Sequence, residues 1–188
     1  MAEVGRVVAW LRDQERRVTL EAACATAFGC SIDGVIPTDA VVKVAEGLAQ
    51  AGADRVALAD TVGYGNPAQV HEVVRAVRAA IGPKLAKLHL HDTMGLGLAN
   101  VLAGLEEGIR GFDAALAGLG GCPFAPGASG NIVTEDLVFM LESMGFSTGI
   151  ALEKLIAARD LLHAGVPGEP MHGQVARAGI PKTFRAAA

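Results

Sequence analysis

Aromatic residues are scarce in this sequence, making up 4% of its 188 positions. A core must therefore be built from aliphatic side chains, which the hydrophobic fraction of 51% supplies in quantity. With a charged fraction of only 19%, this composition excludes an intrinsically disordered chain. The length fits one ordinary domain, so we expect a single domain over residues 1–188.

Several signals that would place the chain on a nucleic acid or in a membrane are also missing. The formal net charge is −4, and a protein without a basic surface is not expected to bind nucleic acid. No apolar run approaches the ~18 residues of a membrane span, and the first residues lack the pattern of a secretory signal. Three cysteines without a CxxC pair predict free thiols in a reducing compartment, the cytoplasm.

Short apolar runs alternate with helical patterns along most of the chain. Strands are expected over 17–27, 55–59, 85–91 and 112–117, and helices over 4–14, from Thr38 as N-cap, after Asn66-Pro67, around 98–105, from Thr134 and around 152–156. Such alternation predicts a parallel sheet covered by helices. Asp60 and His91 lie 31 positions apart, close to the ~31 residues of one unit in a ~250-residue barrel. Four strands leave two alternatives open: half of a barrel, or an open sheet.

Two histidines follow one of the expected strands, in the segment Lys87-Leu88-His89-Leu90-His91. Because side chains alternate along a strand, His89 and His91 point to one face and the two leucines to the other. Two imidazoles side by side at a strand end can bind one divalent cation. The alternative is a pair of histidines hydrogen-bonded near a surface loop.

Other candidate residues also follow strands. Asp60 ends the strand before the histidine pair, where it can ligate a metal, orient a ligand, polarise a substrate or cap a loop. A glycine-rich segment over 118–131 follows the last strand and contains Cys122. Its backbone amides can approach a ligand closely, and Cys122 is either an acid/base or nucleophilic thiol, or a structural one. Cys24 and Cys30 are predicted to pack, and His71, His163 and His172 to lie at the surface.

The glycine-rich segment resembles a family signature almost residue for residue. It reads Gly-Leu-Gly-Gly-Cys-Pro-Phe-Ala-Pro-Gly-Ala-Ser-Gly-Asn over 118–131 and continues into Thr134-Glu135-Asp136-Leu137. Together with Ala59-Asp60-Thr61 and His89-Leu90-His91-Asp92-Thr93, it is similar to the 3-hydroxy-3-methylglutaryl-CoA lyase family of metal-dependent aldolase-like barrels. The resemblance implies an α/β fold, a partial (β/α)8 TIM barrel with about the last four strand-helix units plus carboxyl-terminal helices.

The resemblance also implies roles for individual residues. His89, His91 and Asn131 match the protein ligands of a divalent metal, Mg²⁺ or Mn²⁺, and His89 is additionally a candidate proton shuttle. Cys122 matches a loop thiol that acts as acid/base, and Asp60 matches an aspartate of the site. Three further loop residues are assigned to the substrate: Gly120, Gly121 and Ser129.

The implied reaction is cleavage of 3-hydroxy-3-methylglutaryl-CoA, an acyl-CoA substrate, into acetyl-CoA and acetoacetate, as in leucine degradation. Two departures from the family's sequence pattern bear on this reaction. The family shows Pro, an aromatic and Glu where this chain has Ser31-Ile32-Asp33. The family's first strand, with an Arg-Asp-Gly motif that supplies a catalytic arginine and a metal-binding aspartate, has no counterpart; Arg12-Asp13 is followed by Gln14. We therefore expect the amino-terminal strands to be absent and lyase activity to be impaired.

Two other hypotheses stay open. The chain can be a non-catalytic half-barrel that assembles as a homo-oligomer or with a complementing amino-terminal half, because open sheet edges favour association. It can also belong to the related synthases that condense acetyl-CoA with 2-oxo acids. The resemblance further predicts weak Mg²⁺ binding, because two imidazoles and an amide oxygen bring no negative charge to a cation that prefers charged oxygen ligands. Zn²⁺ accepts imidazole more readily.

Overall fold

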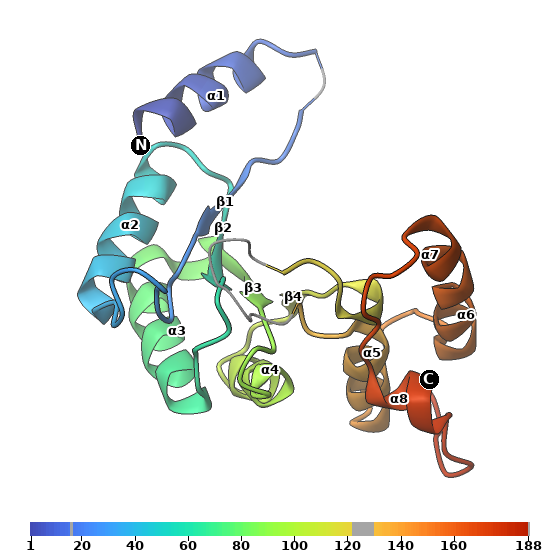
Figure 1. Ribbon diagram of the computed structural model, residues 1–188. Helices are drawn as coiled ribbons and strands as arrows, with labels where there is room; N and C mark the ends of the chain where they lie inside the picture. Colours follow the sequence, from blue (N-terminus) through green and yellow to red (C-terminus); the bar gives the residue numbers. More distant parts are fainter. Residues whose placement is uncertain (16, 122–129, 188) are drawn as a thin grey trace. The chain divides into compact units, whose positions relative to one another are not determined.

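Four parallel strands form one sheet in the computed structural model, which describes residues 1–15, 17–121 and 130–187 (Figure 1). The sheet order follows the chain. The strands are β1 (Glu21–Cys24), β2 (Arg55–Asp60), β3 (Leu85–Leu90) and β4 (Gly111–Asp113). The described chain forms two compact units, Met1–Asp113 and, separately, Ala114–Gly121 with 130–187. The sheet belongs to the first unit. The predicted parallel α/β organisation is confirmed.

Helices cover one face of the sheet, and the apolar residues of the strands explain which face. Val56, Leu58, Leu88 and Leu90 are all fully buried. The helices of this unit are α1 (Ala2–Arg12), α2 (Thr38–Gln50), α3 (Pro67–Ile81) and α4 (Gly97–Glu106), with a 3-10 turn η1 (Gly82–Lys84) before β3. α2 contacts β1 and β2, while α3 and α4 contact β3. The opposite face carries the histidines.

The start of α3 follows directly from local sequence. Asn66 is the N-cap: its side-chain oxygen accepts a hydrogen bond from the Gln69 amide at 3.1 Å, and the Gln69 side chain accepts one from the Asn66 amide at 3.3 Å. Pro67 takes the first helical position, where its missing N–H costs nothing. The helix predicted after Asn66-Pro67 is confirmed, as are those from Thr134 and around 98–105 and 152–156.

Two predicted strands are shorter in the structure. The first covers Glu21–Cys24 rather than 17–27, because Thr26 takes a left-handed conformation with φ 56° that an extended strand cannot contain. The last covers Gly111–Asp113 rather than 112–117, because Ala117 has φ 56° inside a 3-10 turn, η2 (Leu116–Gly118). The predicted N-cap at Thr38 is also wrong: Pro37 holds that position, and the Thr38 hydroxyl donates to Glu72 at 2.6 Å.

The second unit packs helices around a small aliphatic core. Its helices are α5 (Thr134–Ser143), α6 (Leu152–Ala157), α7 (Arg159–Gly165) and α8 (Gln174–Ala178). Buried Val138, Leu152 and Val175 form the core, and Phe139 stacks on Phe184 beside it. α8 was not predicted, since its position depends on α5: the Asp136 carboxylate accepts the amides of Gln174 and Val175 at 2.8 Å each. Among the described residues, no helix is long and apolar enough to cross a bilayer.

Candidate functional site

The histidine pair lies at the carboxyl end of β3, as predicted. The Nε2 atoms of His89 and His91 are 3.2 Å apart, and the ring centroids are 5.1 Å apart with an interplanar angle of 56°. His91 is buried at 5% exposure, whereas His89 is half-buried. The intervening Leu90 is fully buried, which confirms that histidines and leucines point to opposite faces.

The spacing of the two Nε2 atoms fits a shared cation. Metal–nitrogen bonds of about 2.1 Å separate two neighbouring ligand atoms by about 3.0 Å in octahedral and about 3.4 Å in tetrahedral geometry. The observed 3.2 Å lies between these values. Within the described parts of the chain, no group of three or more His, Cys, Asp or Glu side chains is arranged to hold a metal ion. The same distance of 3.2 Å also fits a hydrogen bond between the two rings, the alternative that the sequence left open, so the metal site stays a prediction.

An acidic and a basic side chain extend from the pair along the same face of the sheet. Asp113 Oδ2 lies 3.3 Å from His89 Nδ1, and Asp113 Oδ1 lies 2.9 Å from Lys87 Nζ. Lys87 Nζ also lies 2.5 Å from Glu21 Oε1. The Glu21 carboxylate, followed by that of Asp113, raises the pKa of Lys87 above its ordinary value. Sequence reasoning missed Asp113, because only the register of β3 and β4 places it beside His89.

Asp60 ends β2 and is completely buried. Its Oδ1 accepts the Tyr64 amide and its Oδ2 the Gly65 amide, each at 3.0 Å. Burial raises the pKa of Asp60, while the amides of Gly65, Tyr64 and Gly63 and the nearby His89 partly oppose the shift. A Cβ on Gly65 would lie 2.8 Å from Asp60 Oδ2, so only glycine allows this approach. Asp60 therefore holds the loop after β2, one of the roles foreseen for it, and its role in catalysis stays a prediction.

The two ends of the glycine-rich segment approach each other in the second unit. Gly118 and Gly130 lie so close that a Cβ on Gly130 would overlap the Gly118 carbonyl. Gly120, Gly121 and Asn131 are described, whereas the predicted site residues Cys122 and Ser129 lie outside the described residues. The Asn131 amide nitrogen donates to the Leu119 carbonyl at 2.7 Å. Its Oδ1 is the side-chain atom with lone pairs, and the role of Asn131 as a ligand stays a prediction.

A buried ion pair fixes the turn that leads into this segment. Glu135 is fully buried, and its two carboxylate oxygens accept the Ala117 amide at 3.2 and 3.1 Å. Arg159 pairs with Glu135 and donates to the His172 carbonyl, and the His172 amide in turn donates to the Ala117 carbonyl at 2.9 Å. The left-handed conformation of Ala117 is therefore held from both sides.

The remaining cysteines and histidines take structural positions. Cys24 is buried, and burial raises the pKa of its thiol to about 11, which leaves it protonated and unreactive at neutral pH. Cys30 is half-buried, and both thiols are free. His163 and His172 are exposed as predicted, and His71 is partly exposed. Its ring is half-buried because Nδ1 lies 2.6 Å from Glu107 and Nε2 lies 3.2 Å from Glu106.

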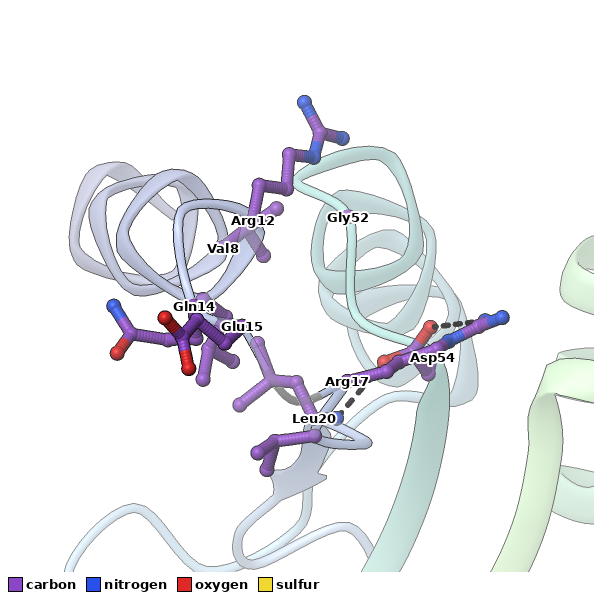
Figure 2. Close-up of a pocket in the computed structure, with 10 residues that line it drawn as sticks. Val8, Arg12, Gln14, Glu15, Arg17, Leu20, Gly52 and Asp54 are labelled. Atoms are coloured by element: carbon purple, nitrogen blue, oxygen red, sulfur yellow. Dashed lines mark hydrogen bonds and ion pairs between the residues drawn. The ribbon is translucent and has the colours of Figure 1, made fainter.

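A pocket of about 420 Å³ lies away from the histidine pair, between α1 and the segment that leads into β1 (Figure 2). Apolar Val8 and Leu20 line it together with Arg12 and Glu15. Asp54 accepts the Leu20 amide at 2.9 Å and pairs with Arg17 at 3.9 Å on its rim. Because the carboxyl ends of parallel strands hold the sites of α/β proteins, this pocket at the amino end of β1 is not the candidate site.

Comparison with known protein families gives a match over most of the chain. Residues 2–162, well over half of the chain, match the HMGL-like family. The chain belongs to this family. It is 44% identical over 145 residues to a hydroxymethylglutaryl-CoA lyase of Bacillus subtilis, and 45% identical over 162 residues to an (R)-citramalyl-CoA lyase of Chloroflexus aurantiacus. The resemblance inferred from the glycine-rich segment and the histidine motif is confirmed.

The chain spans about half the length of these HMGL-like relatives. The alignments cover 77% of this chain and 48% of the Bacillus lyase, and 86% of this chain and 51% of the Chloroflexus lyase. Among solved structures, an HMG-CoA lyase of Acinetobacter baumannii, in complex with coenzyme A and 3-methylmalate, superposes with a TM-score of 0.88 at 43% identity. That superposition covers 100% of this chain and 60% of the other.

Proposed function

We propose that this chain forms the carboxyl-terminal half of a hydroxymethylglutaryl-CoA lyase, a single domain with the last four strand-helix units of a TIM barrel. The observation that carries the proposal is the His89–His91 pair, 3.2 Å apart at the carboxyl end of β3, in a member of the HMGL-like family. The carboxyl ends of barrel strands are where such enzymes hold their sites.

In this proposal His89, His91 and the Oδ1 of Asn131 hold a divalent cation, Mg²⁺ or Mn²⁺. A cation held there would supply Lewis-acid polarisation of the substrate's oxygen atoms. Asp60 holds the loop after β2 through the Tyr64 and Gly65 amides.

Proton transfer completes the proposed reaction. A base removes the proton of the substrate hydroxyl, and the carbon–carbon bond breaks. The former hydroxyl carbon becomes the ketone carbonyl of acetoacetate. The electrons of the broken bond form the enolate of acetyl-CoA. The Cys122 thiol then protonates the terminal carbon of this enolate and becomes a thiolate. Gly120, Gly121 and Ser129 line the substrate, since their small size lets backbone amides approach it. We further propose a cytoplasmic location, which the free thiols of Cys24 and Cys30 support, and a role in leucine degradation, which the family resemblance implies.

Acetoacetate release from 3-hydroxy-3-methylglutaryl-CoA tests the proposal. We expect low activity from the chain alone, higher activity with a polypeptide that carries the first four strands, and loss of both in Cys122→Ala. Cys30→Ala, which removes another free thiol, is the matched control and should retain activity. Equal activity of Cys122→Ala and wild type would remove Cys122 from the mechanism.

The similarity to the Chloroflexus enzyme supports a second candidate substrate, (R)-citramalyl-CoA. Both cleavages release acetyl-CoA, so the other product distinguishes them: acetoacetate from one substrate, and pyruvate from the other. A synthase of the related branch would instead release free CoA from acetyl-CoA and a 2-oxo acid. Parallel assays with the three substrates decide between these reactions.

A non-catalytic half-barrel makes a different prediction. Within the described sheet, β1 and β4 each pair with one neighbouring strand, which leaves edges that favour association. We therefore propose that the chain is a homo-oligomer or binds a complementing half. Sedimentation at micromolar concentration should show a species larger than 19.2 kDa. A compact, stable monomer would contradict the homo-oligomer, and a chain that stays monomeric after addition of the polypeptide with the first four strands would contradict the complementing half.

A further inference from the structure

The register of the sheet places an acidic side chain directly beside one histidine of the pair. His89 on β3 is the cross-strand partner of Asp113 on β4, and Lys87 is the partner of Gly111. Neighbouring strands in register bring side chains of one face into contact. Gly111 has no side chain, so Lys87 can extend to Asp113, the next residue on that face.

Asp113 uses its two carboxylate oxygens on two different partners. Oδ2 lies 3.3 Å from His89 Nδ1, and Oδ1 lies 2.9 Å from Lys87 Nζ. Lys87 is itself anchored by Glu21 on β1 at 2.5 Å. The carboxylate of Asp113 is therefore fixed from the side opposite His89, and it cannot turn away without losing the ammonium.

This arrangement selects one tautomer of the neutral His89 ring. The contact between Asp113 Oδ2 and His89 Nδ1 is an ion-pair contact at 3.3 Å, and because a carboxylate oxygen can act only as an acceptor, it favours the ring proton on Nδ1. Nε2 then carries the lone pair, and it is Nε2 that faces His91 at 3.2 Å. Histidines that bind metals usually donate their other N–H to a carboxylate or carbonyl, which fixes the orientation of the ring.

We propose that Asp113 is a positioning residue that holds the Nδ1–H of His89 and presents Nε2 to the cation, with Lys87 keeping Asp113 in place. This inference rests on the proposed metal site, and it adds a role for two residues that do not touch the cation. The positioning role also accounts for a lysine on β3 and a glutamate on β1. Both lie on the sheet face that carries the histidines, beside the small side chains of Ala23 and Ala57.

Asp113→Asn tests the proposal in a way that a merely structural role would not. The Lys87 ammonium needs an acceptor, so the amide oxygen of the substituted side chain turns toward Lys87 and its NH₂ group toward His89 Nδ1. Nδ1 must then accept, and the ring proton moves to Nε2. In the double variant Asp113→Asn with Lys87→Met the ammonium no longer holds the amide oxygen, so the amide can present either its oxygen or its NH₂ group to Nδ1 and the preference for Nε2–H weakens.

The readout is the tautomer of His89 in the metal-free, ¹⁵N-histidine-labelled full chain, measured by NMR at a pH where the ring is neutral. His89→Gln assigns the signal among the five histidines. We expect Nδ1–H in wild type, Nε2–H in Asp113→Asn and both tautomers in the double variant. Zn²⁺ affinity by calorimetry should fall about 10- to 100-fold in Asp113→Asn and recover in part in the double variant.

Asp54→Asn is the matched control, because its carboxylate also binds a backbone amide and a cationic side chain but lies at the other end of the sheet. Asp54→Asn should change neither the His89 tautomer nor the Zn²⁺ affinity. Nε2–H in wild-type protein would overturn the proposal without any variant, as would an unchanged tautomer in Asp113→Asn. If the tautomer responds but no lyase activity is found even with the polypeptide that carries the first four strands, the positioning role stands and the proposed function fails. Activity with an unresponsive tautomer gives the reverse.

Discussion

Replacing Asp60, which holds the loop after β2, should lower the stability of the protein. Asp60→Ala leaves the Tyr64 and Gly65 amides without their acceptor inside the protein. A buried donor left unpaired costs about 1–3 kcal/mol, so we expect the free energy of unfolding to fall by at least that amount. Urea denaturation measures it. Asp39→Ala, which removes an exposed carboxylate bonded to the Ala40 amide, is the control and should cost less.

Glu142 gives the chain a stability that depends on pH. The Thr148 hydroxyl and amide, followed by the Ala187 amide, donate to its carboxylate and lower its pKa from the ordinary value of 4.5. A lowered pKa in the folded state stabilises the protein above pH 4.5, and this contribution is lost as pH falls through the lowered value. Wild type should therefore exceed Glu142→Gln in stability at about pH 7, and the difference should shrink toward about pH 3. A difference that grows on acidification would contradict this assignment.

At the scale of elements, two helical glycines should respond oppositely to alanine. A Cβ at Gly104 in α4 would lie 2.7 Å from Leu88 Cδ1 and 3.1 Å from Phe112 Cε1, and Leu88 is fully buried. Gly104→Ala should destabilise the sheet–helix contact by about 1–3 kcal/mol. Gly5 in α1 has nothing within 4 Å, so Gly5→Ala should stabilise by about 0.5–1 kcal/mol. Thermal unfolding of both variants measures the contrast.

What could be predicted from the sequence at this scale was local. Alternation along β3 placed His89 and His91 on one face, and Asn66-Pro67 marked the start of α3. The strand ends could not be predicted, because the conformation of Ala117 depends on Glu135, 18 positions away. Asp113 was missed for the same reason: its contact with His89 depends on the register between two strands.

At the scale of the whole molecule, the chain has the parallel sheet and histidine motif of the HMGL-like family and spans about half of its relatives. The first unit holds His89, His91, Asp60 and Asp113, whereas Asn131 lies in the second unit. The roles of Cys122 and Ser129 were carried by the resemblance alone. The proposed function therefore depends first on whether the histidine pair binds a cation.

Calorimetric titration of the chain with Zn²⁺, in the presence of a non-coordinating reductant, tests this most directly. Because the two Nε2 atoms are 3.2 Å apart, we expect one equivalent to bind at the pair and Mg²⁺ to bind far more weakly, since imidazoles bring no negative charge. His91→Ala should remove that binding event, and His163→Ala, which removes an exposed histidine of α7, should leave it unchanged. The same Zn²⁺ isotherm in wild type and His91→Ala would contradict the assignment of His89 and His91 as metal ligands.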